Sequence, residues 1–277
     1  MFADIPGLGF YLWYANWDRK QYLITNDASL LHMRTFLIAF VGVFSLLSIP
    51  LSNSAPGERN INSNHNIISD VDNNELLVKN LYAECNLTDK LDYNVFKHAM
   101  DGYNSIELSN KKLLSIIDYS KPSTEKRFFI IDIENHKLLY HTLVAHGKKS
   151  GYLNATKFSN KYGSYKSSLG FFRTGNSYFG IRGYSLKLEG LEKGINDNAR
   201  LRGIIIHGAN YVDERLVNGN GVIGRSWGCP AVSNKLSKEI INLLKGGSLL
   251  YIYANDELYK ENSVIAKLNT NENSNLN

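Results

Sequence analysis

The stretch RFFIIDIENHKLLYHTLVAH, residues 127–146, decides the fold class of this 277-residue chain. It contains two short runs, RFFIIDI and LLYHTLVAH, that are rich in β-branched and aromatic residues. The polar residues Glu134, Asn135 and His136 separate the two runs. Short runs of this composition on either side of a polar turn predict a β-hairpin. We therefore expect this part of the chain to consist mainly of β-strands.

The same pattern continues toward the C-terminus. Further strand-like runs lie at residues 177–188, 203–207 and 248–253. Residues 234–244 carry apolar side chains at helical spacing, and Gly246 and Gly247 close this helix. The sequence thus predicts a mostly β domain with one packed helix.

A small helical segment is expected before the β domain. Residues 73–83 and 91–101 each place apolar side chains on one helical face, and Gly102 is a suitable stop for the second helix. Segments rich in Asn, Ser and charge flank the folded part and bury little. The expected boundaries are an upstream extension at 1–32, a signal peptide at 33–55, a linker at 56–72, the helical segment at 73–112, the main domain at 113–255 and a disordered tail at 256–277.

Residues 33–55 have the composition of a secretory signal. Arg34 precedes an apolar run of about 15 residues that ends at Pro50, shorter than the ~20 residues of a spanning helix. An uncleaved membrane anchor and a buried core helix are the alternatives. Because signal peptides stand at the N-terminus, we expect Met33 to be the true initiator and residues 1–32 to be a mis-annotated extension, or else a cytoplasmic tail. Export would place the chain in the periplasm or cell envelope, where disulfides can form.

The charge balance is only modestly basic, with 31 Lys and Arg against 26 Asp and Glu. This surplus is compatible with an anionic surface such as a cell envelope. The sequence shows no basic cluster interleaved with aromatic residues, so nucleic acid is not an expected partner.

The stretch GRSWGCPAV, residues 224–232, holds one of the two cysteines, Cys229. Three interpretations are open: a nucleophile, half of a disulfide with Cys85, or a small buried residue. Gly228 and Pro230 place Cys229 in a turn that a carbonyl group could approach closely. The backbone N–H groups of Gly228 and Cys229 could then form an oxyanion hole. A nucleophilic thiol also needs a base or a cationic neighbour, because little of it is ionised at neutral pH.

Among seven histidines, His207 is the best candidate for that base. It ends the apolar run RGIIIHGAN, residues 202–210, and Gly208 follows at once. A histidine at the end of a core strand can present its imidazole at a sheet edge, although a satisfied core histidine fits the same pattern equally well. A zinc site is disfavoured because the sequence has no CxxC, HExxH or paired His-Cys spacing.

The segments IIIHGAN and GRSWGCPAV together resemble the catalytic signature of the murein L,D-transpeptidase family, which is His-Gly, a spacer, and Ser-x-Gly-Cys. The blocks LVAHGKKSG, FSNKYGSYKSSLGFFRTG and KGGSLLYIY look like parts of the same family. The resemblance covers roughly Leu113 to Ala254. It implies an L,D-transpeptidase-type β-sandwich with one packed helix, and no cofactor or metal.

The resemblance also implies roles for individual residues. Cys229 would be the nucleophile, His207 its base, and the Gly208 carbonyl the group that orients the imidazole. The substrate would be a peptidoglycan stem peptide that loses D-Ala to form an acyl-enzyme. An amine of another stem or of an envelope protein would accept the acyl group, whereas water would make the protein a carboxypeptidase. An inactive wall-binding module is the remaining alternative.

Two positions depart from the family pattern. Many members have His at the position of Trp227 and an Arg soon after the Cys, where this chain has Pro230. Arg225, Arg182 or Arg173 could substitute for that Arg. Further residues in family-like blocks or near the motif are candidates for the substrate groove, with turn, strand or core packing as the alternative: Ser226, Arg225, Trp227, Tyr211, His146, Ser164, Ser168 and Gly170.

Overall fold

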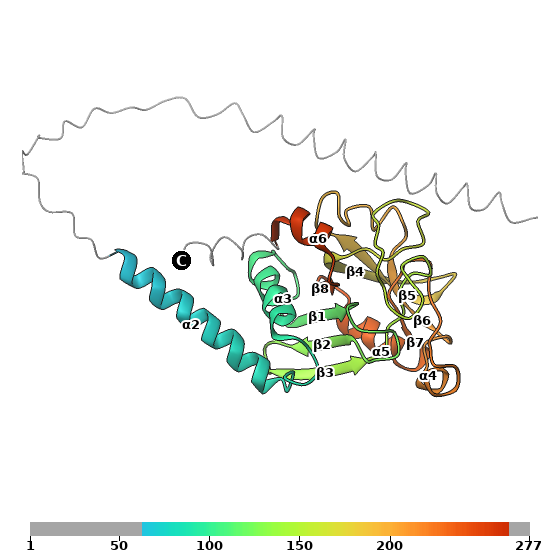
Figure 1. Cartoon of the computed structure of the whole chain (residues 1–277), viewed down its shortest axis with the longest axis horizontal. Coiled ribbons are helices and arrows are strands. Elements are labelled where there is room, and N and C mark those ends of the chain that lie inside the picture. Colours follow the sequence, from blue (N-terminus) through green and yellow to red (C-terminus); the bar gives the residue numbers. More distant parts are fainter. Residues whose placement is uncertain (1–62, 266–277) are drawn as a thin grey trace, which may run out of the picture. The chain divides into compact units, whose positions relative to one another are not determined.

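The computed structural model describes residues 63–265, and side chains from residue 74 onward. The expected extension at 1–32 and signal peptide at 33–55 lie outside these residues. No helix within 63–265 is long and apolar enough to cross a membrane. The elements in chain order are α2 (Ser63–Glu84), α3 (Tyr93–Ser105), β1 (Leu113–Asp118), β2 (Phe128–Asp132), β3 (Lys137–Thr142), β4 (Gly170–Gly180), β5 (Gly183–Gly190), β6 (Ile205–Ala209), α4 (Glu214–Asn220), β7 (Ala231–Ser233), α5 (Asn234–Leu244), β8 (Leu249–Tyr253) and α6 (Glu257–Asn262) (Figure 1).

All eight strands belong to one sheet, in the order β3-β2-β1-β8-β4-β5-β6-β7. The pairs β1–β8 and β6–β7 are parallel, and the other pairs are antiparallel. The two edges approach each other, because the N–H of Ala145, just after β3, donates to the carbonyl of Ala231 in β7 at 2.8 Å. The sheet is therefore nearly closed, and the predicted mostly β fold is confirmed.

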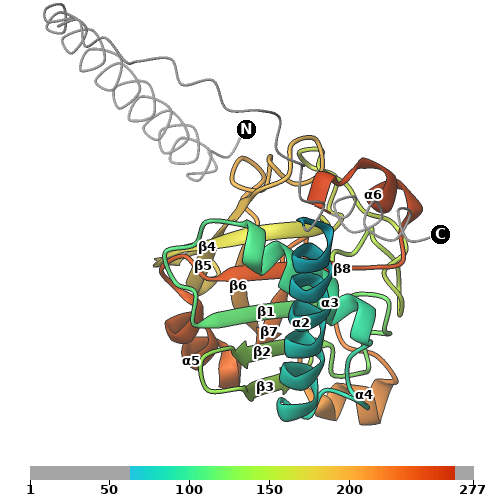
Figure 2. The ribbon, with the colours of Figure 1, turned by 90° about the vertical axis from the view of Figure 1, so that its left-hand side faces the viewer.

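Helices cover both faces of this sheet. On β8, Tyr251 stacks on His98 of α3 and on Phe171 of β4. Three residues further along β4, the hydroxyl of Thr174 donates to the Leu244 carbonyl of α5 at 2.6 Å. Because side chains along a strand alternate between faces, α3 and α5 lie on opposite faces. Figure 2 shows α3 in front of β1 and β8. The predicted helix at 234–244 is confirmed as α5.

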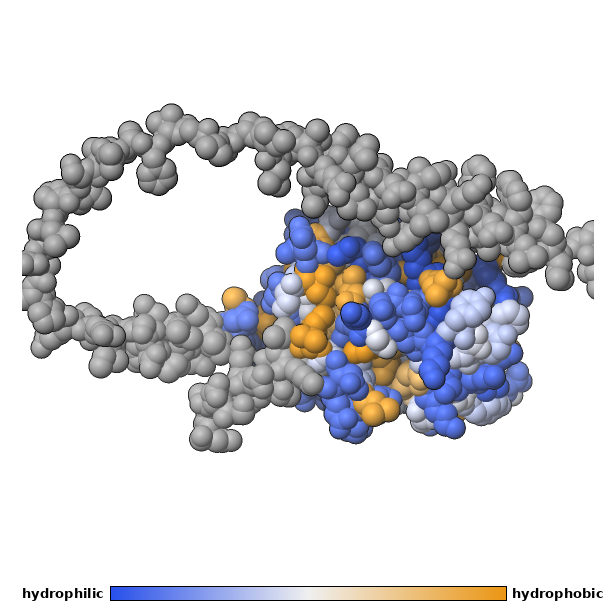
Figure 3. Space-filling view, turned by 90° about the horizontal axis from the view of Figure 1, so that it is seen from above, coloured by the Kyte–Doolittle hydropathy of each residue, from blue (hydrophilic) through white to orange (hydrophobic). Residues whose placement is uncertain are grey.

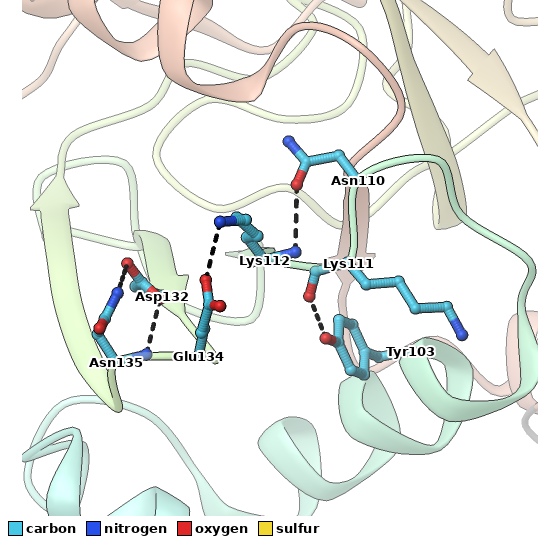
Figure 4. Close-up of polar contacts among 7 residues, drawn as sticks. All are labelled: Tyr103, Asn110, Lys111, Lys112, Asp132, Glu134 and Asn135. Atoms are coloured by element: carbon cyan, nitrogen blue, oxygen red, sulfur yellow. Dashed lines mark hydrogen bonds and ion pairs between the residues drawn. The ribbon is translucent and has the colours of Figure 1, made fainter.

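The predicted hairpin at 127–146 is also confirmed, as β2 and β3. In its turn the Asp132 carboxylate accepts hydrogen bonds from the backbone N–H and the side-chain amide of Asn135, each at 2.9 Å. Lys112, just before β1, forms an ion pair with Glu134 at 3.0 Å (Figure 4). Local side-chain bonds of this kind favour a turn over a continued strand.

The structure differs from the expected elements in several places. The run at 177–188 is a hairpin, because Gly180 and Gly183 flank a reversal and Gly183 has a φ of 76°. Strands β1 and β7 and helix α4 were not expected. Helix α2 begins at Ser63, inside the expected linker, in a segment that contains no helix-breaking Pro or Gly.

Helix α6 lies inside the expected disordered tail. Its Tyr259 is buried, and so is the following Ser263. Both hydroxyl groups donate to the buried carboxylate of Glu192. The polar composition of this tail predicted disorder. The helix is nevertheless ordered, because the buried Tyr259 and its acceptor Glu192 are enough to hold it to the domain.

Exposed apolar side chains are scattered over the described surface. On the face seen in Figure 3, apolar residues lie in separate groups among hydrophilic ones. Several of the most exposed apolar residues lie on loops and on the β4–β5 turn, including Tyr162, Phe179, Ile181 and Trp227.

Candidate active site

The pairing of strands β6 and β7 places Cys229 and His207 in neighbouring segments of the sheet. The two strands are parallel, with His207 opposite Ala231. Cys229 precedes Ala231 by two residues, which places it beside Ile205, and the Ile205 backbone N–H reaches the sulfur. The thiol of Cys229 donates to the carbonyl of Gly203 at 3.6 Å. The half-buried thiol therefore lies at the start of the strand that carries His207.

The imidazole of His207 is held in one orientation. Only 4% of this residue is exposed, and its Nδ1 lies 2.9 Å from the Gly208 carbonyl oxygen. Because a carbonyl only accepts, Nδ1 carries the proton and Nε2 keeps a free lone pair. Burial lowers the pKa of His207, and the nearby positive charge of Arg182 lowers it further. A neutral imidazole in this tautomer can act as a base.

Opposing effects act on the pKa of the Cys229 thiol. Burial raises its pKa, whereas the Ile205 N–H and the positive charges of Arg182 and Arg202 lower it. The net effect is an increase in pKa, so the resting group is the thiol. Such a thiol needs a base to become nucleophilic.

The loop before β7 is fixed by the hydroxyl of Ser226. This hydroxyl donates to the Cys229 carbonyl at 2.6 Å and accepts from the Gly228 N–H at 3.0 Å. Gly228 has a φ of 122°, and a Cβ atom there would lie 2.8 Å from the Lys166 carbonyl oxygen, so only glycine fits. The Gly228 N–H is thus already bonded within the loop. The expected pairing of the Gly228 and Cys229 N–H groups toward one oxyanion does not fit this arrangement.

A buried network holds the Ser226 backbone from outside the loop. The Ser226 N–H donates to the His146 carbonyl at 2.9 Å, and the Ser226 carbonyl accepts from the backbone N–H of Lys148 at 2.7 Å. The fully buried guanidinium of Arg127 donates to His146 Nδ1 at 2.8 Å. Burial lowers the pKa of His146 to about 4, and the charge of Arg127 contributes. His146 is fully buried, so the expectation that it lines the substrate groove is wrong.

The other groove candidates take mainly structural positions. Ser168 is buried and donates to the Ser159 carbonyl at 3.0 Å. Gly170 has a φ of 95°, and a Cβ atom there would lie 2.0 Å from a Glu192 oxygen. Tyr211 is half-buried and packs against Gly224, and its hydroxyl pKa is raised to about 12, first by burial and then by the negative charge of the Cys229 thiolate. Tyr211 is therefore the one of the three with an electrostatic link to Cys229.

Arg202 is a further site residue that the sequence did not single out. Its guanidinium donates to the Lys166 carbonyl at 2.6 Å, to the Ser164 hydroxyl at 3.2 Å and to Ser168. Burial lowers the pKa of Arg202, and the negative charge of the Cys229 thiolate opposes this effect. Nothing in the local sequence distinguishes Arg202 from other surface cations, because its partners lie on a distant loop.

The three expected substitutes for the missing Arg lie in different places. Arg173 pairs with Glu189 at 3.7 Å, away from the cysteine. Arg225 donates to the Gly151 carbonyl at 3.0 Å. The guanidinium of Arg182 lies 5.3 Å from the centroid of the Trp227 ring. Arg182 is therefore the one of the three whose charge acts on both Cys229 and His207.

Both cysteines are free thiols, so the structure contains no Cys85–Cys229 disulfide. Cys85 is buried at the end of α2, and burial raises its pKa to about 11. Within residues 63–265, no group of three or more His, Cys, Asp or Glu side chains is placed to hold a metal ion.

Known structures with similar chains include an L,D-transpeptidase from Mycobacterium smegmatis, at 13% identity and a TM-score of 0.33, with 52% of this chain and 59% of that chain covered. The helical cell shape determining protein Pgp2 from Campylobacter jejuni is 16% identical, with a TM-score of 0.34 and coverage of 63% and 60%. An L,D-transpeptidase from Stackebrandtia nassauensis is 14% identical, with a TM-score of 0.32 and coverage of 64% and 76%.

These likenesses are too weak to carry an argument about function. The chain also spans only about 60% of the length of the mycobacterial enzyme. A comparison with curated proteins gives no match. The family model described as the L,D-transpeptidase catalytic domain matches residues 87–253, more than half of the chain, and the chain therefore belongs to that family.

Proposed function

We propose that this protein is a peptidoglycan L,D-transpeptidase of the cell envelope that uses Cys229 as nucleophile and His207 as base. The observation that carries the proposal is the fixed tautomer of His207, whose Nδ1 proton is bonded to the Gly208 carbonyl on a strand paired to the segment after Cys229. This geometry leaves Nε2 available for the thiol proton. The family membership of residues 87–253 supports the same chemistry.

In the first half-reaction, Nε2 of His207 takes the thiol proton as Sγ of Cys229 attacks the carbonyl carbon between the third stem residue and D-Ala. The backbone N–H of Cys229 is the proposed donor to the developing oxyanion. Collapse of the intermediate breaks the C–N bond, and the proton on His207 passes to the leaving amine of D-Ala. The product is a thioester on Cys229.

In the second half-reaction, an amine attacks the thioester and gives up a proton to His207, which returns it to the thiolate. An amine from another stem gives a 3→3 cross-link, and an amine on an envelope protein attaches that protein to the wall. Water in place of the amine gives an L,D-carboxypeptidase. The choice depends on how well the acceptor site excludes water.

The test is incubation of the purified chain with tetrapeptide muropeptides, followed by mass spectrometry of intact protein and products. We expect Cys229 to gain the mass of the stem without D-Ala, and we expect this adduct to vanish in Cys229→Ala and to fall sharply in His207→Ala. Cys85→Ala is the matched control and should acylate normally. Sacculus binding that survives Cys229→Ala, without any adduct in the wild type, would instead identify a wall-binding module.

A further inference from the structure

An exposed group of cations and aromatic rings surrounds Trp227, two residues before Cys229 in the chain. The ammonium of Lys148 is 4.8 Å from the ring centroid of Tyr165 and 5.3 Å from that of Trp227. The guanidinium of Arg182 lies 5.3 Å from the same Trp227 ring, which is itself 59% exposed. We call these four residues the Trp227 platform. The sequence shows no basic cluster interleaved with aromatic residues, but folding assembles one from three segments.

The cations of the platform have no anionic partner among the described side chains. Between Glu134 and Glu189 the chain has nine Lys and Arg residues and no Asp or Glu. No carboxylate among residues 74–265, whose side chains the structure describes, forms an ion pair with Lys148 or Arg182. Each cation instead lies on a ring, which orients it at low cost and leaves its outer side accessible. This arrangement suits an incoming anion.

The position of the platform indicates which kind of molecule carries that anion. Trp227 is two residues from Cys229 in the loop that Ser226 fixes. The charge of Arg182 already acts on both the thiol and the imidazole. A ligand seated on the platform would therefore lie near the reacting groups. A long anionic polymer held there would cover Cys229, whereas a substrate with an anionic group would be aligned for reaction.

We propose that the Trp227 platform selects stem peptides that carry a free side carboxylate near the scissile bond over stems that carry a primary amide at the same position. This inference rests on the proposed transpeptidase function. A carboxylate accepts charged hydrogen bonds from both cations, whereas a neutral amide gains little from them. Trp227, which stands where many relatives have His, supports both cations on one ring.

The experiment compares two synthetic stems that differ only in carboxylate or amide at one side position, with acylation of Cys229 followed by mass spectrometry. For the wild type we expect a KM about tenfold lower for the carboxylate stem, with similar kcat, because charged hydrogen bonds contribute to binding. In Arg182→Gln and Lys148→Gln the preference should shrink toward unity. High salt should shrink it as well.

Lys187→Gln is the matched control. Lys187 lies 5.3 Å from the Tyr178 ring on the same hairpin, so this variant loses an equivalent charge away from Trp227. It should keep the preference. An equal KM for the two stems in the wild type, or a preference that survives in Arg182→Gln and Lys148→Gln, would overturn the inference while leaving the transpeptidase proposal intact. Failure of the wild type to acylate either stem would instead contradict the proposed function. Tight, salt-sensitive binding of a phosphate polymer with no stem preference would assign the platform to a polyanion and overturn the carboxylate proposal.

Discussion

At the scale of single residues, the hydroxyl of Ser226 connects the two ends of the loop that carries Cys229. It donates to the Cys229 carbonyl and accepts from the Gly228 N–H, and Ser226 is only 3% exposed. Its removal leaves one buried donor and one partly buried acceptor without partners, which costs on the order of 1–3 kcal/mol. It also releases the backbone that positions the thiol.

We therefore predict that Ser226→Ala lowers kcat/KM for acylation by about 10- to 100-fold, because a misplacement of about 1 Å at a reacting group has effects of this size. Mass-spectrometric acylation rates and chemical denaturation give the two measurements. Ser233→Ala is the control, because the Ser233 hydroxyl caps α5 without touching the loop. It should lose about 1 kcal/mol of stability and keep its rate. Equal rates in wild type and Ser226→Ala would show that the loop is held by its backbone alone.

At the scale of elements, α6 is attached to the segment that leads into the site. The buried carboxylate of Glu192 accepts from the Phe171 N–H at 2.7 Å, from the Tyr259 hydroxyl at 3.3 Å and from Ser263. The chain runs from Glu192 to Arg202 and then to Gly203, whose carbonyl accepts from the Cys229 thiol. Helix α6 lies beyond the family match, which ends at residue 253.

We predict that a chain ending at Asp256 loses on the order of 2–4 kcal/mol of stability, because Glu192 then keeps its buried charge with two donors fewer. Loosening of the 192–203 segment should also speed alkylation of Cys229 by iodoacetamide. Leu258→Ala is the control, since Leu258 is 70% exposed on α6 and should change neither property. Unchanged stability in the truncated chain would show that α6 does not support this segment.

At the scale of the whole molecule, the sequence predicted the elements whose formation depends on residues close together in the chain. The β2–β3 hairpin and α5 have local turn and helix signals, and both are confirmed. Strand β1 was missed because LLSIID is a short apolar run without period. Of its two partners, β2 lies nearby in the chain and β8 lies more than 130 residues away. Cys229 and His207 stood out through their glycine-rich motifs. The buried contact between Arg127 and His146 could not be foreseen, because only closure of the sheet brings the loop at 146 against Ser226.

Histidines from several elements are buried or half-buried in the folded chain, and this makes the stability of the molecule depend on pH. Burial is the largest cause of a lowered pKa at His98, His141, His146 and His207. For His146 the pKa falls from 6.5 to about 4. Between these values the unfolded chain binds a proton that the folded chain does not, so stability is complete above pH 6.5 and falls as the pH drops toward 4.

The His146 contribution to this loss is about 3 kcal/mol, from 1.36 kcal/mol for each unit of pKa shift. Asp118 and Glu192, whose pKa values are raised by burial, act in the opposite direction, because their folded forms bind protons more readily than the unfolded chain. The prediction is therefore tested on His146→Asn, which keeps an acceptor for Arg127 but does not titrate. Urea unfolding at pH 7 and at pH 4.5 should show a smaller difference for His146→Asn than for the wild type. Ser226→Ala, which loses stability without losing a titrating group, should keep the wild-type difference. The same pH dependence in all three proteins would mean that His146 is protonated in the folded state despite its burial beside Arg127.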